Sequence, residues 1–204
     1  MRLSAKVLRA SGAAVLALGV MTGVASAGPL HDAARAGDVA LIEKLLGEGA
    51  AINERDGSDE TPLMAAALAA NTDAVDILLR HGADATLRND RGMTALHAAA
   101  FGGDTVAVAF LLESIDVNDA DNKFGVTPLI VAAEENRGDV VVLLVASGAS
   151  LDQAERHGYS ALTRASYHSL DGIITILLRS GAACQEIDPA WKTDCEARKA
   201  AIGL

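Results

Sequence analysis

Two cysteines are the residues of this chain with the widest range of possible chemistry. Cys184 and Cys195 have ten residues between them, including Trp191, the only tryptophan. Such a pair can ligate a metal, exchange electrons, form a structural disulfide or lie in a core as two small apolar side chains. No Cys-x-x-Cys motif or histidine cluster accompanies them, which argues against a metal site. Catalytic redox pairs usually have two intervening residues, so a redox centre is not favoured either.

The other candidate residues form no recognisable catalytic motif. Five histidines are spread along the chain, and none has a nucleophile or a carboxylate at a characteristic spacing. Glu134 and Glu135 are adjacent, but neighbouring residues of a helix point in different directions, so a solvated helix end is the better interpretation. The chain has no glycine-rich phosphate loop, nucleophile elbow or zinc-protease motif. We therefore expect neither an enzyme nor a bound cofactor or metal.

Residues 1–27 have the layout of a secretory signal peptide. Three basic residues open the chain, an uncharged apolar run follows over 10–24, and Ala25-Ser26-Ala27 has the small residues of a cleavage site. The apolar run is too short for a good membrane span, which needs about 20 residues. We expect cleavage after Ala27. Because alanine-rich signals are typical of bacteria, we expect a periplasmic product.

The charge of the chain argues against nucleic acid as a partner. The net charge is −10, and loss of residues 1–27 would remove three of the 17 basic residues and no acid, giving −13. An acidic protein repels phosphate backbones and anionic membrane surfaces. No later segment is apolar enough to span a bilayer, so we expect no membrane insertion after cleavage.

From residue 28 onwards the sequence repeats every 33 residues. When the chain is written in lines of 33 residues from residue 28, the five lines begin with GPLHDAA, TPLMAAA, TALHAAA, TPLIVAA and SALTRAS. Later in each line comes an aliphatic segment such as IEKLL or VDILL, and four lines then have a Gly-Ala pair. This recurrence predicts repeat units at 28–60, 61–93, 94–126, 127–159 and 160–192.

These lines resemble the ankyrin repeat, whose Thr-Pro-Leu-His-x-Ala-Ala opening is visible almost literally. The resemblance covers essentially all of residues 28–204. It implies an all-α solenoid of stacked helix-turn-helix units with loop fingers, in one domain. It also implies a structural role for His31 and His97, since the family uses histidine at this position to hydrogen-bond the backbone around the turn.

The residue types favour the same fold independently. Thr or Ser at the start of a line is a good helix N-cap, and proline is well tolerated at the first helical position after it. Leu and two Ala then give a short helix with a thin apolar side, and the second helix carries larger apolar residues and ends at Gly. Neither helix can bury its apolar face alone, so the units must stack.

Two lines depart from the pattern. In the third, LLESIDVN lacks the glycine, and an extra residue precedes Thr127, which predicts a longer loop there. In the first, Gly57 and Asp59 precede the next line, whereas the later lines have glycine at 92, 125 and 158. The loop between repeats one and two is therefore expected to differ in shape.

Residues 193–204 are predicted to form a single C-terminal cap helix. Thr193 and Glu196 have the spacing of a capping box, and Asp188-Pro189 is an alternative start. The polar residues that follow would keep one face of this helix in water, while the other face stacks on repeat five.

The alignment of the lines also places the cysteines. Cys195 falls where other lines have Leu, and Cys184 falls where Ile52 and Leu151 stand, so both are expected to face the core. In an oxidising compartment a Cys184–Cys195 disulfide is favoured, contributing about 3 kcal/mol for a loop of this length. Two free buried thiols are the alternative.

The resemblance further indicates where a partner would bind. Ankyrin stacks use the loop tips between repeats and the exposed end of each first helix. Four of the six aromatic residues outside residues 1–27 fall at these positions, as do several charged residues. The predicted protein-binding residues are Arg91, Met93, Phe101, Lys123, Phe124, Glu134, Glu135, Arg156, His157, Tyr159 and Tyr167. Alternatively, the rings pack against neighbouring loops and stiffen them.

The sequence thus predicts a monomeric, non-enzymatic adaptor that binds an unidentified protein on its concave face. Two alternatives remain open. One is a self-associating structural module, which a concentration-dependent oligomer would support. The other is a small thiol-redox protein using Cys184 and Cys195, which a reactive thiol would support.

Overall fold

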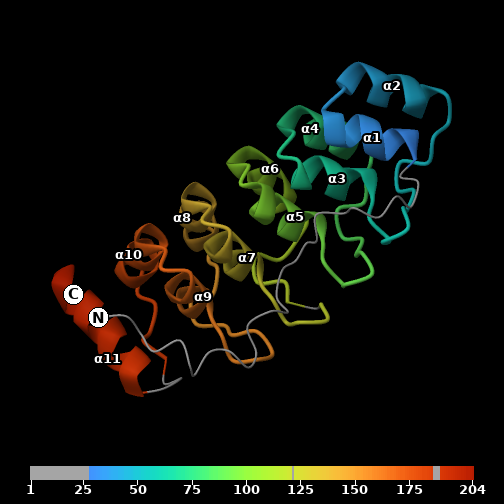
Figure 1. The fold of residues 1–204 in the computed structure, drawn as a ribbon. Helices are drawn as coiled ribbons and strands as arrows, with labels where there is room; N and C mark the ends of the chain where they lie inside the picture. The colour runs from blue at the N-terminus through green and yellow to red at the C-terminus, as the bar shows by residue number, and fades with distance from the viewer. Residues whose placement is uncertain (1–27, 121, 186–188) are drawn as a thin grey trace.

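The computed structural model describes residues 28–120, 122–185 and 189–204, so the predicted signal peptide lies outside the described residues. In these ranges the chain forms eleven helices and no strand (Figure 1). The helices are α1 (Pro29–Ala36), α2 (Val39–Gly47), α3 (Pro62–Leu68), α4 (Thr72–Arg80), α5 (Ala95–Gly102), α6 (Thr105–Leu111), α7 (Pro128–Glu134), α8 (Gly138–Ala146), α9 (Ala161–Tyr167), α10 (Asp171–Arg179) and α11 (Pro189–Ala201).

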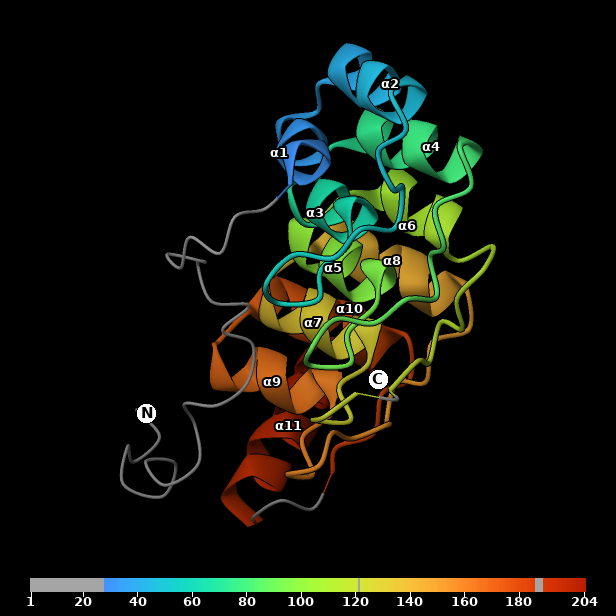
Figure 2. The same ribbon diagram turned by 90° about the vertical axis from the view of Figure 1, so that its right-hand side faces the viewer.

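The first ten helices form five antiparallel pairs that stack in chain order. The first helices of the pairs, α1, α3, α5, α7 and α9, lie side by side in one layer, and the second helices form the other layer. The loops between pairs extend in a row on the side of the first helices (Figures 1 and 2). The predicted all-α solenoid with loop fingers is confirmed.

The first helices begin where the threonine-proline signal predicts. The hydroxyl oxygens of Thr61 and Thr127 accept hydrogen bonds from the backbone N–H groups of Met64 and Ile130, at 3.3 and 3.2 Å. Proline follows each threonine at the first helical position, where its missing N–H leaves no hydrogen bond unmade.

The core runs continuously along the stack between the two layers. Ala66, Ala67, Ala99 and Ala132 of the first helices are fully buried, and these small side chains let neighbouring helices approach closely. The larger aliphatic residues fill the space between the layers. Leu63, Leu96, Leu129, Leu78, Leu111 and Leu144 are at most 1% exposed, and each contributes roughly 1.5–3 kcal/mol of burial free energy.

The first loop has the same shape as the later ones, so the expected difference is wrong. The same backbone hydrogen bond closes all four turns. Asp59 N donates to Asp56 O at 3.0 Å, and the glycines at 92, 125 and 158 donate to the equivalent carbonyls at 2.8–3.2 Å. Asp59 has a φ of 58°, in the left-handed region that glycine adopts at the equivalent positions 92, 125 and 158. Asp tolerates this region better than most residues, because its short polar side chain can hydrogen-bond locally.

The third repeat has the longer loop that its sequence predicts. Helix α6 has seven residues, whereas α4 and α8 have nine. The segment 112–127, between α6 and α7, is correspondingly longer than the segment 81–94 between α4 and α5.

The cap helix begins earlier than the predicted bounds of 193–204. Helix α11 starts at Pro189, inside the predicted fifth repeat unit, and ends at Ala201. Thr193 is therefore not an N-cap, and its hydroxyl donates to the carbonyl of Pro189 at 2.8 Å within the helix. Proline at the first position outweighs the capping box, because its fixed φ already suits a helix start.

Candidate functional site

The four loops between repeats are tied to one another through their backbones. We call them fingers one to four; they comprise residues 53–60, 86–93, 119–126 and 152–159. Asp90 N donates to Ser58 O at 3.0 Å, Lys123 N to Arg91 O at 3.0 Å, and Arg156 N to Phe124 O at 2.9 Å. These bonds fix the spacing of the fingertips before any partner is present.

Side chains within each finger hold the tip in a tight turn. Asp56, Asn89 and Asn122 each accept two backbone N–H groups, from the residues two and four positions later, at 2.8–3.1 Å. In finger four, Glu155 accepts the backbone N–H of His157 at 2.9 Å. Short acidic and amide side chains stabilise turns in this way.

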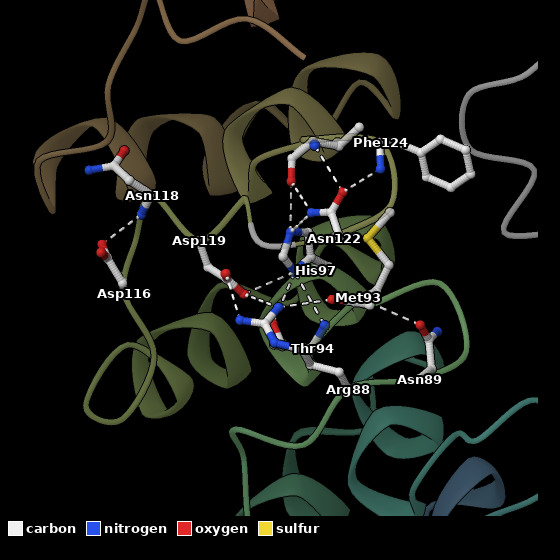
Figure 3. Close-up of polar contacts among 12 residues, drawn as sticks. Arg88, Asn89, Met93, Thr94, His97, Asp116, Asn118, Asp119, Asn122 and Phe124 are labelled. Atoms are coloured by element: carbon white, nitrogen blue, oxygen red, sulfur yellow. Dashed lines mark hydrogen bonds and ion pairs between the residues drawn. The ribbon is translucent and has the colours of Figure 1, made fainter. Parts of the chain in front are cut away.

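His97 lies at the centre of a buried polar network beneath finger three (Figure 3). Its Nε2 donates to the carbonyl of Val126 at 2.9 Å, and the Thr94 hydroxyl lies 2.9 Å from its Nδ1. Burial lowers the pKa of His97, so the ring is neutral and donates from Nε2 alone. His31 likewise holds the carbonyl of Glu60 at 2.9 Å, which confirms the structural role of both histidines.

Arg88 joins fingers two and three. Its guanidinium donates to both carboxylate oxygens of Asp119, at 3.1 and 2.9 Å, and also to the carbonyl of Gly92 at 2.9 Å. Asp119 is buried and lies 4.0 Å from His97 Nδ1, as Figure 3 shows. Such bidentate pairing restricts the geometry of the two side chains more than a single charge contact does.

A second polar network lies between repeats four and five. We call it the inner ionic cluster, and its centre is Arg164, whose side chain is 7% exposed. Arg164 Nη2 donates to Glu155 Oε1 at 3.3 Å, and its Nε lies 4.0 Å from Glu134 Oε2. The guanidinium also lies over the Tyr159 ring, 5.0 Å from its centroid. Helices α7 and α9 and finger four are thereby joined at one point.

Two partly exposed histidines flank this cluster. His157 Nδ1 lies 2.8 Å from Glu155 Oε2 at the fingertip, and His168 Nε2 lies 3.6 Å from Glu134 Oε1 at the helix end. Burial raises the pKa of Glu134, although Arg164 and His168 oppose that shift. Burial likewise raises the pKa of the neighbouring Glu135 carboxyl.

Sequence reasoning missed Arg164, Glu155 and His168. The position of Arg164 carried a usable signal, because the equivalent residues of repeats two, three and four are Ala65, Ala98 and Val131. A charged residue at a position that is small and apolar elsewhere indicates a local polar partner.

The predicted binding residues lie on fingers two to four and on the ends of α5, α7 and α9, so the structure brings them to one side of the stack. Lys123, Arg156, His157 and Tyr167 are exposed, and Arg91, Phe101, Phe124, Glu135 and Tyr159 are half-buried. The Glu134 side chain is nearly buried, at 9% exposed. Met93 is the exception. It is 3% exposed and belongs to the core, because its side chain turns inward at the base of finger two.

The half-buried rings partly serve packing. Phe101 and Phe124 pack against the apolar core, and Tyr159 lies beneath Arg164. Tyr167 is different, because it is 46% exposed. In the part of the chain that the structure describes, its one contact with another ring is an edge-to-face contact with His168.

Cys184 and Cys195 are joined as a disulfide, with Cα atoms 5.8 Å apart. The bond links the segment after α10 to α11. Cys195 is buried, as the alignment of the lines predicts, whereas Cys184 is only half-buried. Among the described residues no group of three or more His, Cys, Asp or Glu side chains is arranged to hold a metal ion. Within the same ranges no helix has the length and apolar character to cross a bilayer.

Comparison with known families matches this geometry. A model of ankyrin repeats in three copies matches residues 30–121 and 115–188. No match was found among the curated proteins. The two matched ranges together span most of the chain and, apart from Pro29, they contain all five helix pairs described above. The chain belongs to the ankyrin-repeat family.

Proposed function

We propose that this protein is a non-catalytic adaptor of the cell envelope, which binds another protein through fingers two to four and the ends of α5, α7 and α9. Ankyrin repeats generally serve as protein–protein interaction modules. In this proposal the protein acts as a monomer.

The observation that carries the proposal is the backbone bonding between successive fingertips. Binding costs free energy when loops and side chains must be ordered. Here the bonds from Lys123 to Arg91 and from Arg156 to Phe124 hold the tips in place beforehand. The buried networks around His97 and Arg164 hold their bases. A partner would therefore meet a preformed surface.

The chemistry of that surface suits a protein partner. Exposed Lys123 and Arg156 offer charged contacts on adjacent fingertips, and Tyr167 offers a large ring at a helix end. Tyr and Arg are the residue types that most often dominate binding energy at interfaces. Phe101 near the end of α5 and Phe124 on finger three pack against the core and add half-buried apolar surface to the same elements.

The compartment is inferred from two separate features. Residues 1–27 have a signal-peptide pattern, which favours export. The Cys184–Cys195 disulfide is the state expected in an oxidising compartment such as the periplasm. Neither feature identifies the partner.

The test is a capture experiment with matched variants. Immobilised protein without residues 1–27 is exposed to envelope extract, beside a triple variant with Lys123→Ala, Arg156→Ala and Tyr167→Ala. The control carries Lys44→Ala, Arg80→Ala and Arg179→Ala, which remove exposed basic residues from the second helices. All three proteins are first compared by circular dichroism.

We expect a protein retained by the native form and the control, with at least tenfold weaker binding to the triple variant. Equal retention by all three would place the binding face elsewhere. If no protein is retained and sedimentation instead reveals a concentration-dependent oligomer, the self-associating module replaces the adaptor. Thiols that titrate in the freshly isolated protein would favour the redox alternative.

A further inference from the structure

Helix α11 covers α10 of the fifth helix pair. Leu178 of α10 is 1% exposed. The equivalent residues of the earlier second helices, Leu79, Leu112 and Val145, are only half-buried. Cover by α11 accounts for this difference, because Leu178 lines the contact between α10 and α11.

Helix α11 is itself weakly embedded. Of its 13 residues only Cys195 is buried, whereas α10 buries four residues out of nine. Trp191 and Ile202 are half-buried against the core. A hollow of about 270 Å³ remains between α10 and α11. The apolar residues Ile174, Leu178 and Ile202 line it together with the polar residues Asp171, Thr175 and Arg198. The packing of the cap is therefore incomplete.

The ion pair between α11 and α10 is weak. Arg198 donates to Asp171 of α10 at 2.6 Å, but the two side chains are 39% and 77% exposed. Exposed ion pairs stabilise little. A helix of this length is also marginal on its own in water, so it depends on what holds it against the stack.

The disulfide is the covalent attachment of α11, and its position suits a role in holding the helix in place. Cys195 is the one buried residue of α11, and Cys184 lies in the segment that follows α10. The covalent bond thus joins the cap to repeat five at the only point where the cap is fully buried. Helices α1 to α10 contain no cysteine, so reduction would not break a covalent link within the stack.

We propose that the Cys184–Cys195 disulfide is a redox-controlled latch, whose reduction by a dithiol releases α11 and uncovers the apolar end of the stack. In this step one thiolate of the dithiol attacks a sulfur of the pair, forming a mixed disulfide and freeing one cysteine. The second thiol of the reductant then displaces the other cysteine. Two electrons pass to Cys184 and Cys195, which take up two protons, and the reductant leaves as its own disulfide.

Release would change the surface of the protein at one end only. Ile174 and Leu178 would lose the cover of α11 and meet water. The fingers and the inner ionic cluster do not include α11, so they would keep their arrangement. The latch is therefore separate from the proposed binding face, and its test needs no partner.

Hydrogen exchange read by mass spectrometry tests the latch on the whole chain after removal of residues 1–27. The protein is compared before and after treatment with dithiothreitol, with thiol titration to verify that both cysteines are reduced. We expect exchange in 189–201 to quicken about 100-fold, since a cross-link closing a loop of this length favours closure by roughly two powers of ten. Amides of α4 and α6 should keep their rates.

A Cys184→Ala, Cys195→Ala double variant is the matched control. Without reductant it should exchange in 189–201 like the reduced protein, and reductant should not change it further. An Arg198→Ala variant with the disulfide intact should keep most of the protection. The latch is overturned if 189–201 stays protected after both thiols titrate, or if α4 and α6 lose protection together with α11.

Discussion

Arg164 joins the last two repeats through buried charge contacts. It is the only cation that contacts both Glu155 and Glu134 in the ion pairs of the described residues, and all three side chains are at least nine-tenths buried. Removing one member of a buried ion pair leaves an uncompensated charge, which costs more than the pair contributes.

We predict that Arg164→Ala lowers the free energy of unfolding by about 3–5 kcal/mol. Urea denaturation followed by circular dichroism measures this loss. Arg156→Ala is the control, since Arg156 is exposed on the neighbouring fingertip and its removal should cost less than about 0.5 kcal/mol. Similar losses in the two variants would show that the inner ionic cluster does not stabilise the fold.

Glu60 is a residue whose charge opposes folding. It is 3% exposed, and burial, with a smaller contribution from Asp56, raises the pKa of its carboxyl. A folded-state pKa above the unfolded value means that ionisation destabilises the fold. The cost is present above the folded-state pKa and vanishes below the unfolded value of about 4.3.

Glu60→Gln is therefore expected to stabilise the protein by about 1 kcal/mol at pH 7, because it removes a buried charge and keeps the shape. The gain should shrink as the pH falls through the folded-state pKa of Glu60 and disappear near pH 4. Thermal unfolding across this pH range measures it. Glu113→Gln, at an exposed position, should change little, and a gain that persists at pH 4 would contradict the electrostatic origin.

Single residues also show what the sequence could and could not predict about the site. The roles of His31 and His97 follow from a motif, so they were predictable. The inner ionic cluster was not, because its contacts join residues of two repeats whose side-chain directions depend on the stacked geometry. Met93 was assigned to the binding surface from its place in a finger, but the turn directs its side chain to the core.

At the scale of elements, the close approach of first helices depends on small residues. A Cβ atom on Gly102 of α5 would lie 2.6 Å from the carbonyl oxygen of Ala67 in the neighbouring repeat. That is a backbone atom, so it cannot move aside as a flexible side chain could.

We expect Gly102→Ala to destabilise the protein by about 1–3 kcal/mol through overpacking between repeats two and three. Gly172→Ala in α10 is the matched control, because no atom lies within 4 Å of its added Cβ. That change should instead stabilise by about 0.4–1 kcal/mol, since alanine reduces the conformational freedom of the unfolded chain. Melting temperatures of the two variants that move in the same direction would refute this account.

Elements that the repeat pattern specifies directly were the most predictable. The helix pairs and their order follow from the 33-residue repeat, and the longer loop after α6 follows from the departure of the third line from that repeat. The start of α11 could not be predicted in this way. Two competing start signals, Pro189 and Thr193, lie four residues apart, and the 33-residue repeat favours Thr193, whereas the helix begins at Pro189. Asp59 shows a further limit, since sequence alone could not tell that it adopts the glycine-like conformation.

At the scale of the whole molecule, each repeat is stabilised mainly by its interfaces with the adjacent repeats. Each helix pair packs on the pairs before and after it, so the stack behaves as a one-dimensional array. A destabilising substitution in a middle repeat should therefore weaken the coupling between the stabilities of the two ends of the stack.

Leu129→Ala in α7 tests this behaviour, because Leu129 is 1% exposed at the centre of repeat four. We expect a loss of about 2–5 kcal/mol. Hydrogen exchange should quicken more in α8 and α9 than in α1 to α4, since the distant repeats retain their own interfaces. A uniform increase along the chain would indicate a single cooperative unit instead.

The bonds between fingertips also affect how repeats can be added to such a protein or lost from it. In all three bonds the donor lies 32 residues after the acceptor, and it always points back to the preceding finger. A duplicated 33-residue unit inserted between two fingers would therefore bring its own donor and acceptor into the same register. The chain can in this way gain or lose fingers by whole-unit duplication or deletion, and selection can then alter the exposed tips without rebuilding their support.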